Sequence, residues 1–329
     1  MRAVGLLVML VLLAVGVLAG CQRSPQTVKV SVALDWYPWS NHAGLFIAQE
    51  KGYFREEGLE VHLYTPADPS TVLQTVGAGK DDFGISYQPD VLLARAQGVP
   101  VVSIAGMVQH PLNSVMALRE SGIQRPRDLV GKKVGYPGIP LNVPLLKTMV
   151  EKDGGDFSKV ELVNIGFDLV PALVGKKVDA VIGAYWVHES IVLEQQGFPV
   201  NSMRVEQWGV PDFYELVLVT NEKTLSERPD LVKRFLRATL KGYRVASQDL
   251  ERAVDTLARA SPQVDSKVER EGIRLLAPLW QDAPTFGWQT AERWEAFTAW
   301  MRNAGLLERP VDASKAFTNR FIEELSRER

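Results

Sequence analysis

Two segments of the chain repeat one pattern of residues, and this repeat constrains the fold more than any single motif. Residues 79–101 read GKDDFGISYQPDVLLARAQGVPV, and residues 175–200 read GKKVDAVIGAYWVHESIVLEQQGFPV. Each runs from Gly-Lys through an acidic residue into a short strand, then an aromatic residue, a helix and Gly-x-Pro-Val. Such a repeat predicts two lobes of similar topology. The alternative is that Gly-Lys-x-Asp simply turns a helix into a strand, with the glycine as its cap.

The repeat also pairs candidate functional residues. Aligning Gly84 with Gly183 pairs Tyr87 with Trp186 and Asp90 with Glu189. In each segment the two residues follow a predicted strand and open the next helix, which is where open α/β sheets bind ligands. We therefore expect the residues of one lobe to face those of the other lobe across a cleft.

Short β-branched runs alternate with helical patterns over the first two hundred residues, as expected for α/β lobes with parallel-rich sheets and helices on both faces. A chain of 329 residues also exceeds the size of one core. From Pro229 the pattern is helical almost to the end. We assign residues 28–113 plus 218–329 to lobe 1 and residues 114–217 to lobe 2. The expected strands are Val28–Leu34, Glu60–Tyr64, Val101–Val108, Val134–Tyr136, Val160–Ile165 and Ala180–Ile182.

The amino terminus is typical of an exported lipoprotein. Arg2 is followed by an uncharged run that ends in Leu18-Ala19-Gly20-Cys21, the only cysteine of the chain. We interpret residues 1–20 as a signal peptide, Cys21 as the lipidation site and residues 21–27 as a tether. The expected location is the extracytoplasmic face of the cell membrane or the periplasm, with the leaflet left open. A single-pass membrane anchor is the alternative.

Charge and motifs exclude several classes of function. The formal net charge is −2, and no basic stripe suggests nucleic-acid binding. The four histidines have no metal-ligand spacing, and no nucleophile, Walker or dinucleotide motif follows a strand. We expect a monomer with no catalytic residue, no metal and no cofactor.

Aromatic residues gather after the first expected strand, in Asp35-Trp36-Tyr37-Pro38-Trp39-Ser40-Asn41-His42. Such rings hold a flat ligand by stacking, and we choose Trp36 as the ligand-facing ring. Tyr37 or Trp39 covers the edge of the domain. Asn41 caps the next helix, contacts the ligand, or does both. His42 is either a ligand donor or a structural histidine.

The second lobe offers a matching set of candidates. Tyr185, Trp186 and Glu189 follow a strand, and Glu189 is an acceptor for an amino group or a protonated ring nitrogen unless it only complements the helix dipole. Tyr214, with Glu215, is expected on the hinge side. The loop around Gly138 is a candidate amide nest for an anion, although Pro137 and Pro140 remove two donors.

The segment VSVALDWYPWSNHAGLFIAQEKGYFREEGLEV resembles the thiamine-pyrimidine-precursor family of bacterial solute-binding proteins and fungal pyrimidine synthases. The resemblance continues through GKDDFGIS, DLVGKKVGYPG, NIGFDLVPALVGKKVDAVIGAYWVHE and GVPDFYELVLVTN. It implies a two-lobed, type II-like periplasmic-binding-protein fold that closes over a formylaminopyrimidine-type ligand. It also implies delivery to the permease and ATPase subunits of an ABC importer. The implied pyrimidine site lies at or beside Trp36, Asn41, Tyr87, Tyr185, Trp186 and Glu189.

Two departures separate the chain from the enzymes of that family. Ser86 stands where the fungal synthases carry the lysine that holds pyridoxal phosphate, and residues 210–214 contain no cysteine. The binders favour an acidic residue near Ile139, so contacts at that loop differ here. The remaining alternatives are a receptor for a flavin, sulfonate or nitrate, and a pyrimidine-forming synthase.

Overall fold

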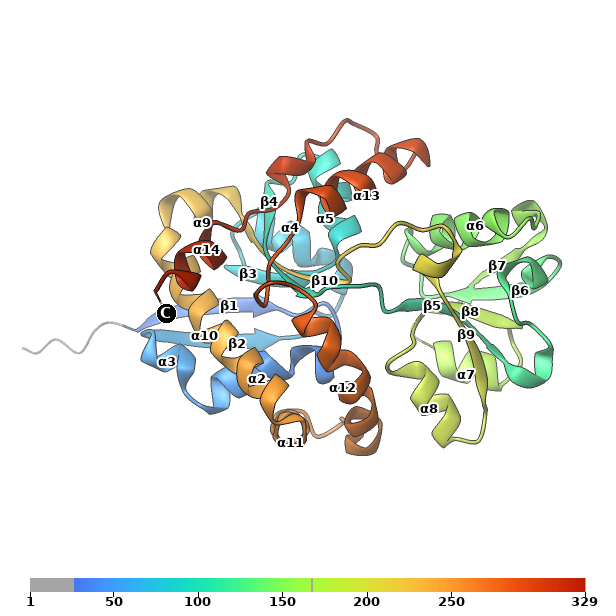
Figure 1. Cartoon of the computed structure of the whole chain (residues 1–329), viewed down its shortest axis with the longest axis horizontal. Coiled ribbons are helices and arrows are strands. Elements are labelled where there is room, and N and C mark those ends of the chain that lie inside the picture. Colours follow the sequence, from blue (N-terminus) through green and yellow to red (C-terminus); the bar gives the residue numbers. More distant parts are fainter. Residues whose placement is uncertain (1–26, 167, 329) are drawn as a thin grey trace, which may run out of the picture.

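The computed structural model describes residues 27–166 and 168–328, which form two α/β lobes joined by two crossing segments (Figure 1). The signal peptide and lipidated cysteine predicted over residues 1–21 lie outside the described residues. Within them, no helix is both long and apolar enough to cross a membrane.

Each lobe is built on a five-stranded sheet, and the two sheets have the same strand order. Sheet 1 has the order β2-β1-β3-β10-β4 and sheet 2 the order β7-β6-β8-β5-β9. The predicted similarity of the two lobes is therefore confirmed. The strands are β1 Val28–Ala33, β2 Leu59–Tyr64, β3 Phe83–Ser86, β4 Val101–Val108, β5 Asn113–Leu118, β6 Lys133–Tyr136, β7 Glu161–Asn164, β8 Ala180–Tyr185, β9 Val200–Arg204 and β10 Leu216–Asn221.

One strand in each sheet runs against its neighbours. β10 is antiparallel to β3 and β4, and β5 is antiparallel to β8 and β9, while β1 and β6 pair in parallel with both of their neighbours. Both antiparallel strands are the first that the chain forms after crossing from the other lobe. They enter from the side where the other strands end, so the sheets are mixed rather than wholly parallel.

β3, β4 and β10 of sheet 1 are buried along their whole length, which explains why they read as largely apolar runs, whereas β1 and β2 alternate between apolar and polar residues. Side chains alternate along β10: Leu216 and Leu218 pack into one core cluster, and Val217 and Val219 into another. The first cluster includes helices on one face of the sheet and the second includes helices on the other. The α/β class with helices on both faces is thus confirmed.

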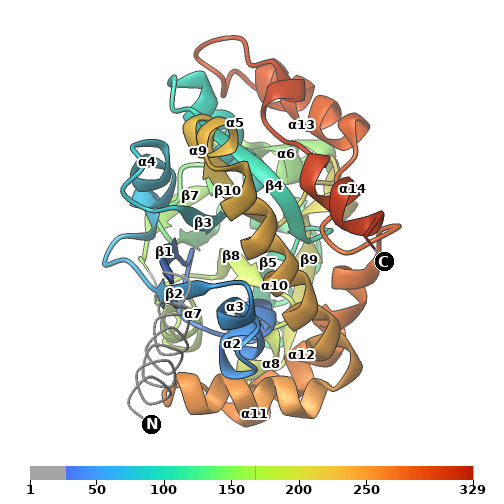
Figure 2. The same ribbon diagram turned by 90° about the vertical axis from the view of Figure 1, so that its left-hand side faces the viewer.

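Helices after β10 pack against lobe 1, as Figure 2 shows for α10 and its neighbours. The predicted apolar stripe of α10, from Leu231 to Tyr243, is buried. The helices are α2 Ala43–Glu50, α3 Tyr53–Glu56, α4 Val72–Gly77, α5 Gln88–Ala96, α6 Asn142–Lys152, α7 Leu169–Val174, α8 Glu189–Gln195, α9 Glu222–Glu227, α10 Pro229–Gln248, α11 Leu250–Ala260, α12 Ser266–Gln281, α13 Ala291–Asn303 and α14 Arg320–Ser326.

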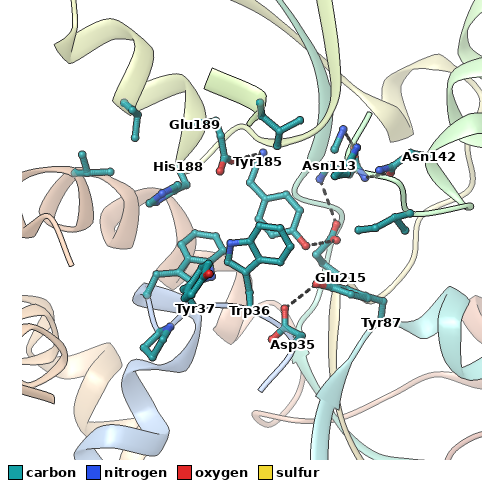
Figure 3. Close-up of a pocket in the computed structure, with 18 of the residues that line it drawn as sticks. Asp35, Trp36, Tyr37, Tyr87, Asn113, Asn142, Tyr185, His188, Glu189 and Glu215 are labelled. Atoms are coloured by element: carbon teal, nitrogen blue, oxygen red, sulfur yellow. Dashed lines mark hydrogen bonds between the residues drawn. The ribbon is translucent and has the colours of Figure 1, made fainter. Parts of the chain in front are cut away.

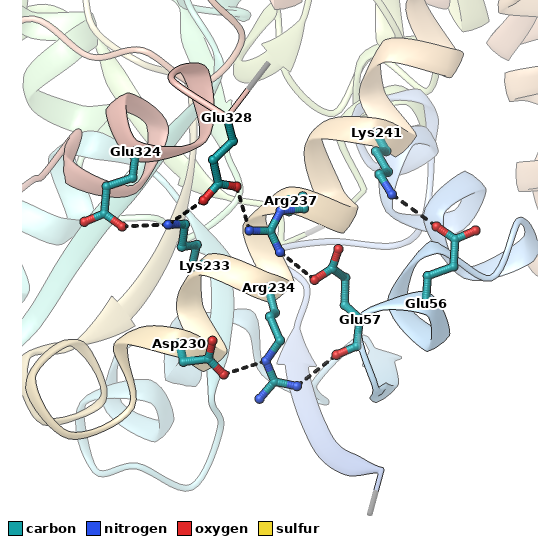
Figure 4. A network of polar contacts seen from close by, with 9 residues as sticks. All are labelled: Glu56, Glu57, Asp230, Lys233, Arg234, Arg237, Lys241, Glu324 and Glu328. Carbon is teal, nitrogen blue, oxygen red and sulfur yellow. Dashed lines mark hydrogen bonds and ion pairs between the residues drawn. The ribbon is translucent and has the colours of Figure 1, made fainter. Parts of the chain in front are cut away.

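Ion pairs on the surface hold the carboxyl-terminal helix to lobe 1 (Figure 4). Lys233 and Arg237 of α10 pair with Glu328, which follows α14, at 2.8 Å each. Arg237 also pairs with Glu57 at 2.7 Å. Because such partly exposed pairs contribute about 0–1 kcal/mol each, the buried stripe of α10 is the stronger attachment.

A polar cluster ties the two crossing segments together. His110 lies on the first crossing and its Nδ1 is 3.0 Å from the carboxylate of Asp212 on the second. Its Nε2 is 2.7 Å from Asp282, which follows α12, and Arg293 pairs with Asp212 at 2.9 Å. The hydrogen bond to Asp212 raises the pKa of the His110 imidazole. The crossings are therefore anchored to the helical part of lobe 1.

Candidate functional site

A cavity of about 390 Å³ lies between the lobes at the ends of both sheets (Figure 3). Lobe 1 contributes the loop after β1 and the start of α5, and lobe 2 contributes the end of β8 and the start of α8. The antiparallel strands add the residues at their amino ends. The position agrees with the general placement of ligands beyond the carboxyl ends of strands.

Five Trp and Tyr rings line this cavity, together with Phe213. Trp36 and Tyr37 meet edge to face with ring centroids 6.3 Å apart, and Tyr37 is 59% exposed at the cavity mouth. Trp39 packs 5.5 Å from Tyr185 across the lobes and is 7% exposed. Tyr87 completes the set from the start of α5. These rings provide flat apolar walls for an aromatic ligand.

A buried carboxylate in lobe 1 organises one side of the cavity. Asp35 Oδ2 accepts a hydrogen bond of 2.8 Å from Tyr87 Oη, and Asp35 Oδ1 lies 2.9 Å from His42 Nε2. Asp35 is 3% exposed, and both of its oxygens have partners. Burial, followed by the charge of Asp35, raises the pKa of the Tyr87 phenol well above its usual value. Tyr87 is therefore a fixed donor to Asp35.

Glu215 plays the corresponding part at the hinge. Its Oε1 accepts a hydrogen bond of 2.7 Å from Tyr185 Oη, and its Oε2 accepts from the backbone N–H groups of Leu112 and Asn113 at 2.6 and 3.2 Å. Burial raises the pKa of the Glu215 carboxyl to about 7, although these hydrogen bonds favour its ionised form. One side chain thus connects both crossing segments to a ring of the cavity.

Two asparagines line the lobe 2 side of the cavity. Asn113 Nδ2 donates to Asn142 Oδ1 at 2.9 Å, and Asn113 Oδ1 accepts from the Gly183 N–H at 3.1 Å. Gly183 has a φ of +96°, and a Cβ there would lie 2.9 Å from Asn142 Nδ2. Asn142 is buried, lines the cavity, and its Nδ2 has no hydrogen-bond partner among the described residues. This amide is a donor available to a ligand.

Two carboxylates stand at the first turns of the helices that the repeat relates. Glu189 Oε2 accepts from the Tyr185 N–H at 2.7 Å, and Figure 3 shows the Glu189 side chain next to Tyr185. Asp90 lines the cavity from α5 and also borders a second cavity of about 450 Å³, in which Gly138 lies. Burial raises the pKa of the Asp90 carboxyl to about 6.

The lobes also touch at the edge of the cavity. Glu269 of α12 accepts a hydrogen bond from the Ser40 N–H at 2.7 Å, and its other oxygen lies 3.2 Å from Nδ1 of His188 in lobe 2. Burial lowers the pKa of the His188 imidazole, but the hydrogen bond to Glu269 and the charge of Glu189 outweigh it and raise the pKa overall. This contact bridges the two lobes.

Four predicted site residues meet at the cavity: Trp36, Tyr87, Tyr185 and Glu189. Trp186 is not among the residues that line it. Its Nε1 donates to the Pro111 carbonyl at 3.2 Å, and the guanidinium of Arg204 stacks 3.6 Å from its ring. Because neighbouring residues at the end of β8 point to opposite sides, Tyr185 rather than Trp186 faces the cavity.

Three other candidates, Asn41, His42 and Tyr214, lie outside the cavity lining. The cap predicted for Asn41 is not formed, because a 3-10 turn over Ser40–His42 delays the start of α2 to Ala43. The backbone carbonyl of Asn41 accepts from Tyr243 Oη, while its buried side-chain amide has no hydrogen-bond partner among the described residues. His42 is the structural histidine beside Asp35. The hydroxyl of Tyr214 accepts from the Thr290 N–H at 2.7 Å.

The sequence interpretation missed Asn113, Asn142 and the pairing of Asp35. A polar residue at the start of an otherwise apolar strand was the available signal for Asn113. Among the described residues, no three His, Cys, Asp or Glu side chains are grouped to hold a metal ion.

Comparison with known proteins gives the family. Residues 39–253 match the family model described as NMT1/THI5 like. The chain is 41% identical over 318 residues to the formylaminopyrimidine-binding protein of Halalkalibacterium halodurans, covering 94% of this chain and 96% of that protein. It is also 29% identical over 297 residues to the 4-amino-5-hydroxymethyl-2-methylpyrimidine phosphate synthase of Legionella pneumophila, covering 89% of this chain and 92% of that enzyme.

A solved structure with a similar fold is the periplasmic aliphatic sulphonate binding protein SsuA from Escherichia coli. The TM-score is 0.70 at 16% identity, over 89% of this chain and 92% of that one. This likeness confirms the predicted two-lobed periplasmic-binding-protein fold. From the family model and the near full-length relative, the chain belongs to the NMT1/THI5-like family.

Proposed function

We propose that the protein is the solute-binding component of an ABC importer and captures a formylaminopyrimidine-type precursor of thiamine between its lobes. The observation that carries this proposal is the cavity itself, which is lined by five Trp and Tyr rings, by Phe213, by the Glu189 carboxylate and by unpartnered polar groups. A flat heterocycle with amino donors fits such walls, because stacked rings add about 0.5–1.5 kcal/mol beyond area burial.

Glu189 is the residue proposed to recognise the amino edge of the pyrimidine. Oε2 already accepts from the Tyr185 N–H, and no described residue donates to Oε1. A hydrogen bond from a ligand amino group or protonated ring nitrogen would satisfy it. Because the acceptor is ionised, that bond is worth about 1.5–3 kcal/mol.

Relatives support a binder more than an enzyme. The 41% identical relative is named as a formylaminopyrimidine-binding protein, and the synthases are more distant. The lysine expected for a pyridoxal phosphate enzyme is replaced by Ser86, which is buried at the end of β3. We therefore propose that the protein binds its ligand without transforming it.

Export and anchoring complete the proposal. Cleavage before Cys21 and acylation of its thiol would hold the receptor at the membrane through residues 21–27. Tethering raises the effective concentration of the receptor beside its permease and ATPase partners. Closure of the two lobes about the crossing segments would then present the ligand-bound receptor to the permease.

Calorimetric titration of the protein, produced from Gln22 onward, with formylaminopyrimidine tests the ligand. We expect saturable binding at micromolar concentration or below, and a loss of about 10- to 100-fold in affinity for Glu189→Gln. Glu194→Gln is the matched control, because Glu194 lies on the same helix with its side chain 55% exposed. Absence of saturable binding, or equal affinities of both variants, would contradict the proposal.

A further inference from the structure

The charged side chains that line the two adjoining cavities are almost all acidic. Among the described residues that line them there is no lysine or arginine, and His188 is the one side chain able to become a cation. The first cavity alone has six carboxylates in its lining: Asp35, Asp90, Glu189, Glu215, Asp265 and Glu269. An anion entering this space would meet repulsion from these carboxylates, with no lysine or arginine to compensate it.

Most of these carboxylates already have a structural task. Asp35, Glu215 and Glu269 are each at most 3% exposed and accept hydrogen bonds from the protein. Asp265 caps α12 by accepting from Lys267 and Val268 backbone N–H groups. Their charges contribute to the field in the cavity, but each of these carboxylates already accepts hydrogen bonds from the protein.

Asp90 differs from the others because no described residue donates a hydrogen bond to its carboxylate. It lies in the first turn of α5, half-buried, where the helix amino terminus favours a negative charge. The raised pKa of its carboxyl reflects burial as the only cause. An unpartnered, desolvated carboxylate is costly to keep in a folded protein unless a ligand uses it.

The matching strand orders strengthen this reading. β3 and α5 of lobe 1 occupy the same places as β8 and α8 of lobe 2, so Asp90 and Glu189 both lie in the first turn of topologically equivalent helices. Among the described residues, Glu189 has one carboxylate oxygen without a hydrogen-bond donor, and Asp90 has two. Carboxylates from both lobes are thus available to the same ligand when the lobes close.

We propose that Asp90 is a specificity-determining residue, which accepts an N–H group of the ligand and, with Glu189, restricts the cavity to neutral or cationic aminopyrimidines. The inference rests on the proposed function. Its consequence is discrimination against phosphate esters, because a phosphate would bring about −1.5 to −2 charge into a carboxylate-lined space. The proline-flanked loop at Gly138, which borders the second cavity, lacks two of the backbone donors that an anion would need.

A matched pair of probes tests the inference: 4-amino-5-hydroxymethyl-2-methylpyrimidine and its phosphate, titrated into the purified protein by calorimetry. We expect the alcohol to bind about 100-fold more tightly than the phosphate. In Asp90→Asn, the affinity for the alcohol should fall about tenfold, and the preference for the alcohol should narrow about tenfold. Asp230→Asn is the control, because Asp230 also lies in the first turn of a helix with its side chain 79% exposed.

Three outcomes would overturn the inference in different ways. If both compounds bind equally to the unaltered protein, charge exclusion is wrong while the proposed function stands. If Asp90→Asn is folded, with a melting temperature no lower than that of the unaltered protein, but keeps both affinities or their ratio, Asp90 is not the specificity residue and exclusion is steric. If neither compound nor formylaminopyrimidine binds, the proposed function fails and the inference fails with it.

Discussion

The hydroxyl of Tyr185 donates a 2.7 Å hydrogen bond to Glu215, which joins a ring of lobe 2 to the segment that returns the chain to lobe 1. The same carboxylate accepts from two backbone N–H groups on the first crossing segment. A ligand that shifts the Tyr185 ring would therefore also displace Glu215, which is hydrogen-bonded to both crossing segments. This arrangement gives a physical route from ligand contact to lobe movement.

Replacing Tyr185 by Phe should weaken ligand binding about tenfold and lower the free energy of unfolding by about 1–3 kcal/mol. The reason is that Glu215, at 3% exposure, loses a hydrogen-bond donor to its ionised form. Calorimetry and urea unfolding measure the two effects. Tyr53→Phe, outside the cavity, serves as control; equal results for the two variants would contradict the role of Tyr185.

Replacing Trp186 by Phe should lower stability and leave affinity unchanged. The indole loses its hydrogen bond to Pro111 and part of its contact with Arg204, for an expected cost of about 1–2 kcal/mol. Unfolding and ligand titration on the same sample separate the two effects. A tenfold loss of affinity without loss of stability would show that Trp186 reaches the ligand after all.

Asp90→Asn should stabilise the ligand-free protein at pH 8 by about 2 kcal/mol, and hardly at all at pH 4. The folded-state pKa of Asp90 is raised from 3.8 to about 6, so burying the ionised form destabilises the fold by about 3 kcal/mol above pH 6, offset by about 1 kcal/mol from the helix dipole. As pH falls from 6 towards 4, the folded state takes up the proton first and the destabilisation disappears.

Urea unfolding of both proteins across this pH range is the measurement. Asp230→Asn, at a solvated first-turn position, should show no such gain at pH 8. A stability difference for Asp90→Asn that does not change with pH would mean that Asp90 is not a desolvated carboxylate.

Much of the fold could be predicted from sequence because strands such as β3, β4, β5 and β10 are buried on both faces. Short runs rich in β-branched residues mark strands, so the bounds predicted for β1, β4 and β6 lie within about one residue of the observed ends. The direction of β5 and β10 could not be predicted. It depends on which lobe the chain has just left, and local residue patterns carry no such information.

The same reasoning explains which site residues were found. Trp36, Tyr87 and Glu189 follow strands whose carboxyl ends lie at the cavity, so the general rule for open sheets identifies them. Asn113 and Glu215 reach the cavity from the amino ends of antiparallel strands, where that rule does not apply. Tyr185 and Trp186 are adjacent, and only the path of the backbone at the end of β8 decides which faces the ligand.

The crystal structure of the protein with formylaminopyrimidine tests the central claim most directly. We predict the pyrimidine in the cavity between the lobes, its ring against Trp36 and Tyr185 and its amino edge within hydrogen-bond distance of the Glu189 carboxylate. A ligand bound outside this cavity, or bound there with Glu189 facing solvent, would contradict the account.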